Sequence, residues 1–149
     1  MKVIVQRASR ASVTVDGVIT GSIDKGFMLL IGFTHTDTID EINLLARKVI
    51  GLRIFEDEFG KINKSLADVN GSILAISQFT LYADCKKGNR PSFTTAMPFD
   101  KANDMYIKFC DTLRSANIKV ETGVFGADMK IDFINDGPVT IILDSNDLK

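Results

Sequence analysis

The sequence is poor in the residues that most often build metal centres and hydrolytic triads: its 149 residues include two cysteines and one histidine. Cys85 and Cys110 form no Cys-x-x-Cys pair and have no histidine partner nearby, so neither a disulfide framework nor a zinc site is expected. His35 falls in a predicted loop without a visible triad or metal-binding partner. We therefore expect no metal and no cofactor.

Long apolar runs are also missing from the sequence. No stretch approaches the ~18 residues that a membrane span requires, and 45% hydrophobic with 25% charged residues is typical of a soluble globular protein. Met1-Lys2-Val3 leads directly into a strand pattern, without the apolar core and cleavage site of a signal peptide. These features predict a cytoplasmic protein without membrane contact, folded as a single domain over residues 1–149.

The charges of the chain nearly cancel. A balance of 18 basic and 19 acidic residues gives a net charge of −1, which argues against a general nucleic-acid-binding protein that relies on many phosphate contacts. Two local basic clusters remain, Arg7 with Arg10 and, in a central loop, Lys86 and Lys87 with Arg90. Each cluster is ordinary as solvated surface unless another feature points to RNA.

Apolar patterns predict the strands. Residues 12–15 and 18–20 flank Asp16-Gly17, a dipeptide typical of two-residue hairpin turns. Unbroken apolar runs predict buried strands at 27–33 and 72–76. Asp136-Gly137 is a second hairpin signal, and Pro138 suits the first residue of the strand that follows. Further strands are expected at residues 2–7, 53–55, 119–121, 129–134 and 139–143.

Two helices are expected between these strands. Apolar residues recur at three- and four-residue spacing from about Thr38, a candidate N-cap, to about Gly51. Pro98 and Asp100 suit the first turn of the second helix. The order of elements predicts an α/β fold, with two packed, largely antiparallel or mixed sheets that are barrel-like and two main helices that cover one side.

Three motifs carry a resemblance to a known family. They are Ser77-Gln78-Phe79-Thr80-Leu81, the basic loop from Lys86 to Phe93, and Asn135-Asp136-Gly137-Pro138-Val139-Thr140. Together with residues 5–13 and the turn at 123–129, they resemble D-aminoacyl-tRNA deacylase, also called D-tyrosyl-tRNA deacylase, over essentially the whole chain. The resemblance implies hydrolysis of the ester that joins a D-amino acid to tRNA.

The resemblance also assigns roles to particular residues. The implied catalytic residues are Ser77, Gln78, Phe79 and Thr140. The implied substrate-binding residues are Gly137, Pro138, Asn135, Met129 and Phe125. The implied RNA-binding residues are Lys87, Arg90 and Arg7, and no metal ligand is expected. The partners implied are D-aminoacyl-tRNA and a second copy of the chain, in a homodimer with its active sites at the interface.

The family further implies that the Gly137-Pro138 peptide bond is cis and that it faces the pocket of the other subunit. A wall of backbone atoms there would reject an L side chain, so L-aminoacyl-tRNA would be spared. Glycyl-tRNA has no side chain that could clash, and we expect it to be hydrolysed.

The chain offers few groups that could activate a nucleophile. Ser77 is not in a Gly-x-Ser-x-Gly elbow, and Thr140 has no evident base. Backbone N–H groups near Ser77, Gln78 and Phe79 could instead stabilise the oxyanion, while the ribose 2′-hydroxyl of the tRNA helps to activate water. Thr140 as the nucleophile is the alternative mechanism.

Two alternatives to an enzyme follow from the same residues. A non-catalytic RNA-binding module could stack bases on Phe79, Tyr82 and Phe93 beside Lys87 and Arg90. A structural dimer could use the Gly137-Pro138 turn only to complete its interface.

Overall fold

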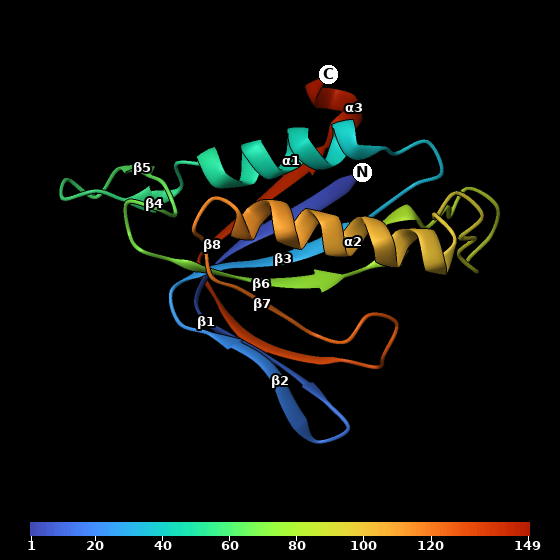
Figure 1. Ribbon diagram of the computed structural model, residues 1–149, viewed down its shortest axis with the longest axis horizontal. Coiled ribbons are helices and arrows are strands. Elements are labelled where there is room, and N and C mark those ends of the chain that lie inside the picture. Colours follow the sequence, from blue (N-terminus) through green and yellow to red (C-terminus); the bar gives the residue numbers. More distant parts are fainter.

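The computed structural model describes all residues from 1 to 149. Figure 1 shows a strongly curved sheet with α1 and α2 lying over one of its faces. The elements, in chain order, are β1 (Lys2–Val15), β2 (Val18–Ile23), β3 (Gly26–Gly32), α1 (Ile39–Gly51), β4 (Phe55–Glu56), β5 (Ile62–Lys64), β6 (Ser72–Ser77), the short 3-10 helix η1 (Phe79–Tyr82), α2 (Phe99–Arg114), β7 (Val120–Thr122), β8 (Lys130–Asp144) and α3 (Ser145–Leu148).

Strand β1 organises the main sheet. Its strand order is β2-β1-β3-β6-β7, and β8 also pairs with β1. β1 is antiparallel to β2, β3 and β8, whereas β3–β6 and β6–β7 are parallel pairs. At the open ends, Gly21 of β2 and Thr122 of β7 approach so closely that no side chain fits between them. The sheet is thus mixed and nearly closed into a barrel, with β4 and β5 as a separate small sheet, which confirms the predicted α/β class.

Strand β3 explains where the core lies. Phe27, Leu29 and Ile31 belong to the large apolar cluster under the helices, whereas Met28 belongs to a smaller cluster on the opposite face. A strand covered on both faces needs apolar residues in succession, which accounts for its unbroken apolar run. The side chain of Tyr106 in α2 ties the helix layer to the sheet, since its hydroxyl donates to the carbonyl oxygen of Ala75 at 2.6 Å.

The predictions that depended on local signals are confirmed. Asp16 and Gly17 both have positive φ, 48° and 78°, as the two-residue hairpin between β1 and β2 requires. Thr38 caps α1 in a full capping box with Glu41, and Pro98 stands immediately before α2. None of the helices is long and apolar enough to cross a membrane.

The prediction of a second hairpin at Asp136-Gly137 is wrong. Residues 130–144 form one strand, β8, which pairs with β1 along its whole length. Gln6 pairs with Thr140 and Ala8 with Asn135, so four residues of β8, 136–139, lie opposite only Arg7. We call residues 136–139 the β8 bulge. The turn signal describes a local outward bend, while the strand continues past it because its partner is β1.

Candidate active site

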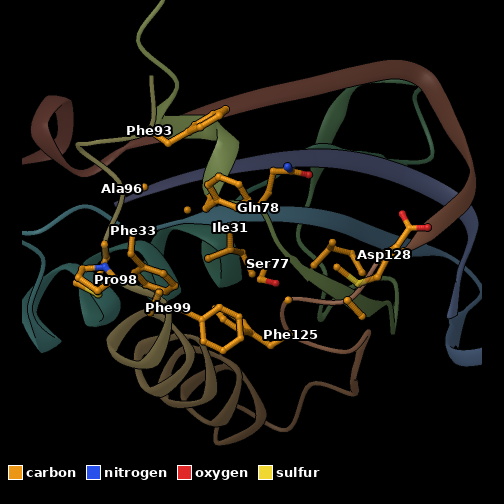
Figure 2. Close-up of a pocket in the computed structure, with 18 of the residues that line it drawn as sticks. Ile31, Phe33, Ser77, Gln78, Phe93, Ala96, Pro98, Phe99, Phe125 and Asp128 are labelled. Carbon is orange, nitrogen blue, oxygen red and sulfur yellow. The ribbon is translucent and has the colours of Figure 1, made fainter. Parts of the chain in front are cut away.

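A largely apolar pocket of about 650 Å³ lies where β3 and β6 end. Figure 2 shows Phe93 on one side of it, Phe99 and Phe125 on the other, and Ser77 and Gln78 between them. Its walls come from the ends of the two strands, the segment before α2, the first turns of α2, and the turn before β8. The lining residues are Ile31, Gly32, Phe33, Ile76, Ser77, Gln78, Phe79, Phe93, Ala96, Met97, Pro98, Phe99, Ala102, Phe125, Gly126, Ala127, Asp128, Met129 and Ile131.

Ser77, Gln78 and Phe79 stand at the point where β6 passes into η1. Ser77 closes the parallel pairing of β6 with β3, and the backbone N–H of Gln78 donates to the carbonyl oxygen of Ile31 at 2.7 Å. This bond occupies one of the N–H groups considered for the oxyanion. Phe79 begins η1, and the first N–H groups of a helix have no partner within it. Phe79 therefore offers the N–H suited to a developing negative charge.

Aromatic rings form much of the pocket wall. Phe79 and Phe93 meet edge to face, with ring centroids 5.0 Å apart, and Phe99 and Phe125 do the same at 4.9 Å. Phe79 remains 56% exposed and so presents apolar surface at the pocket. An open apolar site of this kind favours a flat, uncharged ring in its ligand.

The turn between β7 and β8 brings Phe125 and Met129, two of the predicted substrate-binding residues, to this pocket. It also brings Asp128, whose carboxylate pairs with the exposed Lys130 at 3.0 Å. The family resemblance includes this turn but assigns no role to Asp128. Asp128 is the one acidic residue among those that line the pocket.

The other predicted residues gather elsewhere, around the β8 bulge. The side-chain amide of Asn135 donates to Thr140 Oγ1 at 3.1 Å, and its oxygen accepts from the N–H of Val139 at 3.2 Å. Gln6 also donates to Thr140 Oγ1, at 3.3 Å. The Gly137-Pro138 peptide bond is cis, as the resemblance implied. Within one chain, Asn135 and Thr140 thus brace the bulge and do not line the pocket.

Arg7 does not have the position that an RNA-binding residue needs, and this corrects our expectation. The residue is only 6% exposed. Its Nε donates to the carbonyl oxygen of Asp136 at 3.0 Å and its Nη1 to that of Ile54 at 2.7 Å. With these donors committed to backbone acceptors, Arg7 supports the bulge from beneath.

The basic loop is exposed, by contrast. Backbone hydrogen bonds of 2.8 and 2.9 Å between Asp84 and Ser92 close it at its base. Lys87 and Arg90 are exposed and take part in no ion pair of the structure. Because Phe93 follows directly after this base, the cationic loop lies beside the pocket mouth.

Several residues that line the pocket were not predicted from the sequence, among them Phe33, Pro98 and Phe99. The strand predicted at 27–33 ends one residue earlier, at Gly32, and Pro98 stands directly before α2 as its N-cap. What the local patterns do not contain is that the end of β3 and the start of α2 meet at one pocket.

Comparison with known proteins identifies the family of this chain, and the matches cover nearly its whole length. The sequence model of the family described as D-Tyr-tRNA(Tyr) deacylase matches residues 4–144. A relative from Exiguobacterium sibiricum, named D-aminoacyl-tRNA deacylase, is 56% identical over 144 residues, which are 97% of this chain and 99% of that protein. A relative of the same name from Thermus aquaticus is 52% identical, covering 99% of this chain and 97% of the other.

Solved structures share the fold of this chain. A protein named c-Myc DNA Unwinding Element Binding Protein has a TM-score of 0.91 at 44% identity, with 97% of this chain and 98% of the other covered. A probable eukaryotic D-amino acid tRNA deacylase has a TM-score of 0.83 at 20% identity, covering 95% and 97%, a likeness of fold alone. The barrel-like sheet and the pocket at its strand ends therefore belong to a hydrolase of the tRNA deacylase class, with a fold of mixed helices and strands. The chain is a member of the D-Tyr-tRNA(Tyr) deacylase family.

Proposed function

We propose that this protein hydrolyses the ester of D-aminoacyl-tRNA and releases the free D-amino acid and tRNA, in the cytoplasm where charged tRNA is used. The observation that carries this proposal is the pocket itself: the Ser77-Gln78-Phe79 strand end opens into an aromatic cavity large enough for a terminal nucleoside with its aminoacyl group. The cationic loop beside it suits the phosphates that follow that nucleoside.

The chemistry needs little from side chains, because an aminoacyl ester is already activated. The N–H of Phe79 stabilises the oxyanion, an effect typically worth about 2.7–4 kcal/mol per donor. Ser77 lines the pocket beside it and orients the ester. The ribose 2′-hydroxyl of the substrate helps to activate the attacking water, which explains why the site contains no histidine.

Thr140 suits a structural role better than that of a nucleophile. Its hydroxyl accepts hydrogen bonds from the side-chain amides of Asn135 and Gln6. An amide cannot take a proton from a hydroxyl at neutral pH, whereas nucleophilic activation requires a base in that position.

We propose further that the active protein is a homodimer. Ile142, Ile4, Leu30 and Ile76 are opposite one another across β8, β1, β3 and β6, and so share a face of the sheet. Ile142 is 70% exposed, and Ile76 at the other end of the row lines the pocket. A second copy that covers this apolar row would bring its own β8 bulge toward the pocket, in an isologous arrangement.

In this dimer, the enzyme selects the chirality of the substrate by steric exclusion of the L form. Gly137 and Pro138 are exposed on a bulge that Arg7 and Asn135 hold firmly. Their backbone forms a wall against which an L side chain collides, while a D side chain points away from it. Glycyl-tRNA carries no such side chain and is therefore hydrolysed.

The test is a matched deacylation series on D-tyrosyl-, L-tyrosyl-, glycyl-, D-alanyl- and L-alanyl-tRNA, in which release of the free amino acid is measured. We expect turnover of the two D substrates and of glycyl-tRNA, and sparing of both L forms. No turnover of D-tyrosyl-tRNA would leave a non-catalytic RNA-binding module as the function. Sparing of glycyl-tRNA as firmly as L-alanyl-tRNA would replace the steric wall with positive recognition of the D side chain.

A further inference from the structure

One continuous segment joins the cationic loop to the pocket wall. The Asp84–Ser92 backbone pair closes the loop that carries Lys87 and Arg90. The chain then continues directly into Phe93, Ala96, Met97 and Pro98, which line the pocket. We call residues 93–97 the wall segment. Its placement sets both the shape of the pocket and the direction from which RNA reaches it.

The wall segment has no regular secondary structure of its own, and its hydrogen bonds lead to the turn that follows β3. His35 Nε2 lies 2.8 Å from the carbonyl oxygen of Thr94. The hydroxyl of Thr34 donates to the carbonyl oxygen of Thr95 at 2.5 Å. A backbone bond from Met97 N–H to the carbonyl oxygen of Phe33, 3.0 Å long, continues the contact.

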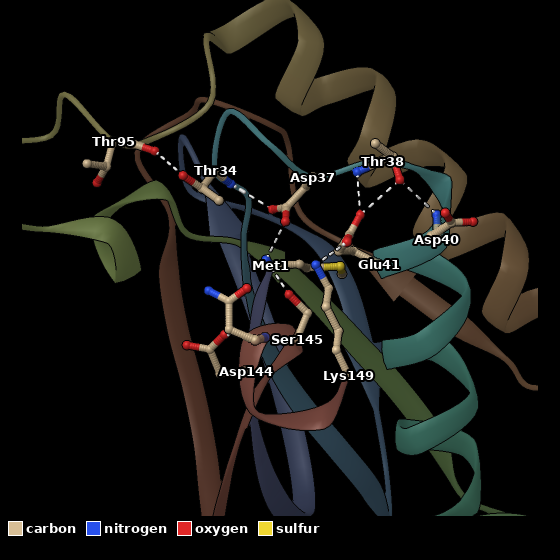
Figure 3. A network of polar contacts seen from close by, with 11 residues as sticks. Met1, Thr34, Asp37, Thr38, Asp40, Glu41, Thr95, Asp144, Ser145 and Lys149 are labelled. Atoms are coloured by element: carbon tan, nitrogen blue, oxygen red, sulfur yellow. Dashed lines mark hydrogen bonds and ion pairs between the residues drawn. The ribbon is translucent and has the colours of Figure 1, made fainter.

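The turn that makes these contacts is itself firmly fixed, as Figure 3 shows. The carboxylate of Asp37 accepts from the N–H of Thr34 at 2.8 Å and pairs with the Met1 ammonium group at 2.6 Å. Met1 also donates to Ser145 Oγ at 2.9 Å. These groups are buried, so their hydrogen bonds compete little with water. His35 therefore projects from a rigid support onto a segment without regular secondary structure, which is also held by a bond from the Thr95 hydroxyl to the carbonyl oxygen of Tyr82 at 3.2 Å.

We propose that His35, the only histidine of the chain, is a positioning residue that holds the wall segment in its pocket-forming arrangement. The inference rests on the proposed function, since the wall contacts the nucleoside of an aminoacyl-tRNA. His35 acts through Thr94 and touches no reacting atom. A ring nitrogen that faces a carbonyl oxygen must carry the proton, and both the neutral Nε2–H tautomer and the charged ring supply it.

Kinetics on D-tyrosyl-tRNA test this role. His35→Ala removes the donor and is expected to lower kcat/KM about two- to ten-fold, mainly through KM, because the lost interaction shapes the site before the reaction begins. His35→Gln, whose amide can donate to the same carbonyl oxygen, should recover most of the loss. Thr36→Ala is the matched control, since Thr36 is an exposed neighbour in the same turn.

Three outcomes would overturn the inference: a His35→Ala enzyme with wild-type KM, no recovery with His35→Gln, or a kcat profile against pH that changes shape in His35→Ala. The last result would make His35 an acid or base in the reaction.

A second measurement does not depend on activity. The chain contains two tyrosines but no tryptophan, so Phe93→Trp places a single tryptophan, which can be excited selectively, in the wall segment. Quenching by acrylamide should rise at least about twofold when His35→Ala is added, because a wall without its donor exposes the ring, and should stay unchanged with Thr36→Ala. Equal quenching in all three proteins would refute the positioning role even if the wild type proves to be an active deacylase. A rise would uphold it even if the deacylase proposal fails.

Discussion

Arg7 in β1 donates from Nε to the carbonyl oxygen of Asp136 in the β8 bulge, 3.0 Å away and 129 residues later in the sequence. Arg7 is also the only residue of β1 that lies opposite the bulge. Its second bond, from Nη1 to the carbonyl oxygen of Ile54, ties the bulge to the segment before β4. A single buried guanidinium thus sets the height at which Gly137 and Pro138 stand above the sheet.

Removing Arg7 should cost both stability and activity. Arg7→Ala leaves the buried carbonyl oxygen of Ile54 and the part-buried one of Asp136 without their donor, and we expect the free energy of unfolding to fall by about 2–4 kcal/mol. Arg7→Lys should recover only part of this, since one ammonium group lacks the planar fork that reaches both acceptors. Urea denaturation and D-tyrosyl-tRNA deacylation measure the two effects, and a fully active, stable Arg7→Ala protein would contradict the assignment.

Gly137 should not tolerate a side chain. Its φ is +129°, and a Cβ atom there would lie 2.8 Å from Val139 Cγ2 and 3.0 Å from an Arg7 guanidinium nitrogen. We expect Gly137→Ala to lower deacylation at least about tenfold, because the bulge must shift. Gly60→Ala is the control: φ is +74° and the space around it is open, so only the backbone strain remains. Similar activity losses in both variants would argue against a site at the bulge.

Lys87 and Arg90 should contribute to tRNA affinity through charge. Each Ala substitution is expected to weaken binding and to reduce the slope of log K against log salt concentration by about one. Lys108→Ala provides the comparison, as Lys108 is exposed on α2 and forms no ion pair. Titrations of tRNA binding at several salt concentrations give the slopes, and unchanged slopes in both variants would place the RNA path elsewhere.

Thr140 should affect the β8 bulge more than the chemical step. Thr140→Ser keeps the hydroxyl that accepts from Asn135 and Gln6 and should retain most of the activity. Thr140→Ala removes the acceptor and should slow single-turnover deacylation about ten- to a hundred-fold. A nucleophile's loss would nearly abolish the step, so turnover within a few fold of background in Thr140→Ala would restore the nucleophilic mechanism.

Glu41 should make stability depend on acid pH. The ammonium group of Lys149, the N–H of Thr38 and the Thr38 hydroxyl lower the pKa of the Glu41 carboxyl from 4.5 to about 2. Since the folded pKa lies below the unfolded one, the carboxylate stabilises the fold above pH 4.5 and this contribution disappears between pH 4.5 and 2.

Glu41→Gln keeps one oxygen that can accept from the N–H of Thr38, but it removes the charge and replaces the oxygen that pairs with Lys149 by an amide NH2 group. We expect it to lower the free energy of unfolding by about 0.5–1 kcal/mol at pH 7, and the difference from wild type should shrink toward zero near pH 2. Denaturation curves at both pH values are the measurement. A difference that stays constant across this range would show that the charge is not responsible.

The sequence alone determined the features whose causes are contained in a few neighbouring residues. Asp16-Gly17 makes its hairpin because both residues adopt positive φ readily, and Thr38 with Glu41 starts α1 because they satisfy each other's backbone donors. The unbroken apolar run of β3 reports burial on both faces. The family motifs also identified the β8 bulge and five of the residues that line the pocket, which are Ser77, Gln78, Phe79, Phe125 and Met129.

Only the tertiary structure decided what depends on partners distant in sequence. Asp136-Gly137 bends without reversing the chain because β1, more than a hundred residues earlier, pairs on both sides of it. The N–H of Gln78 is unavailable to an oxyanion because Ile31 accepts it. Arg7 is buried because Ile54 and Asp136 surround it with acceptors, and His35 gains a role because Thr94 comes within 2.8 Å. Each of these contacts forms only after the strands have paired, so no local pattern of residues contains it.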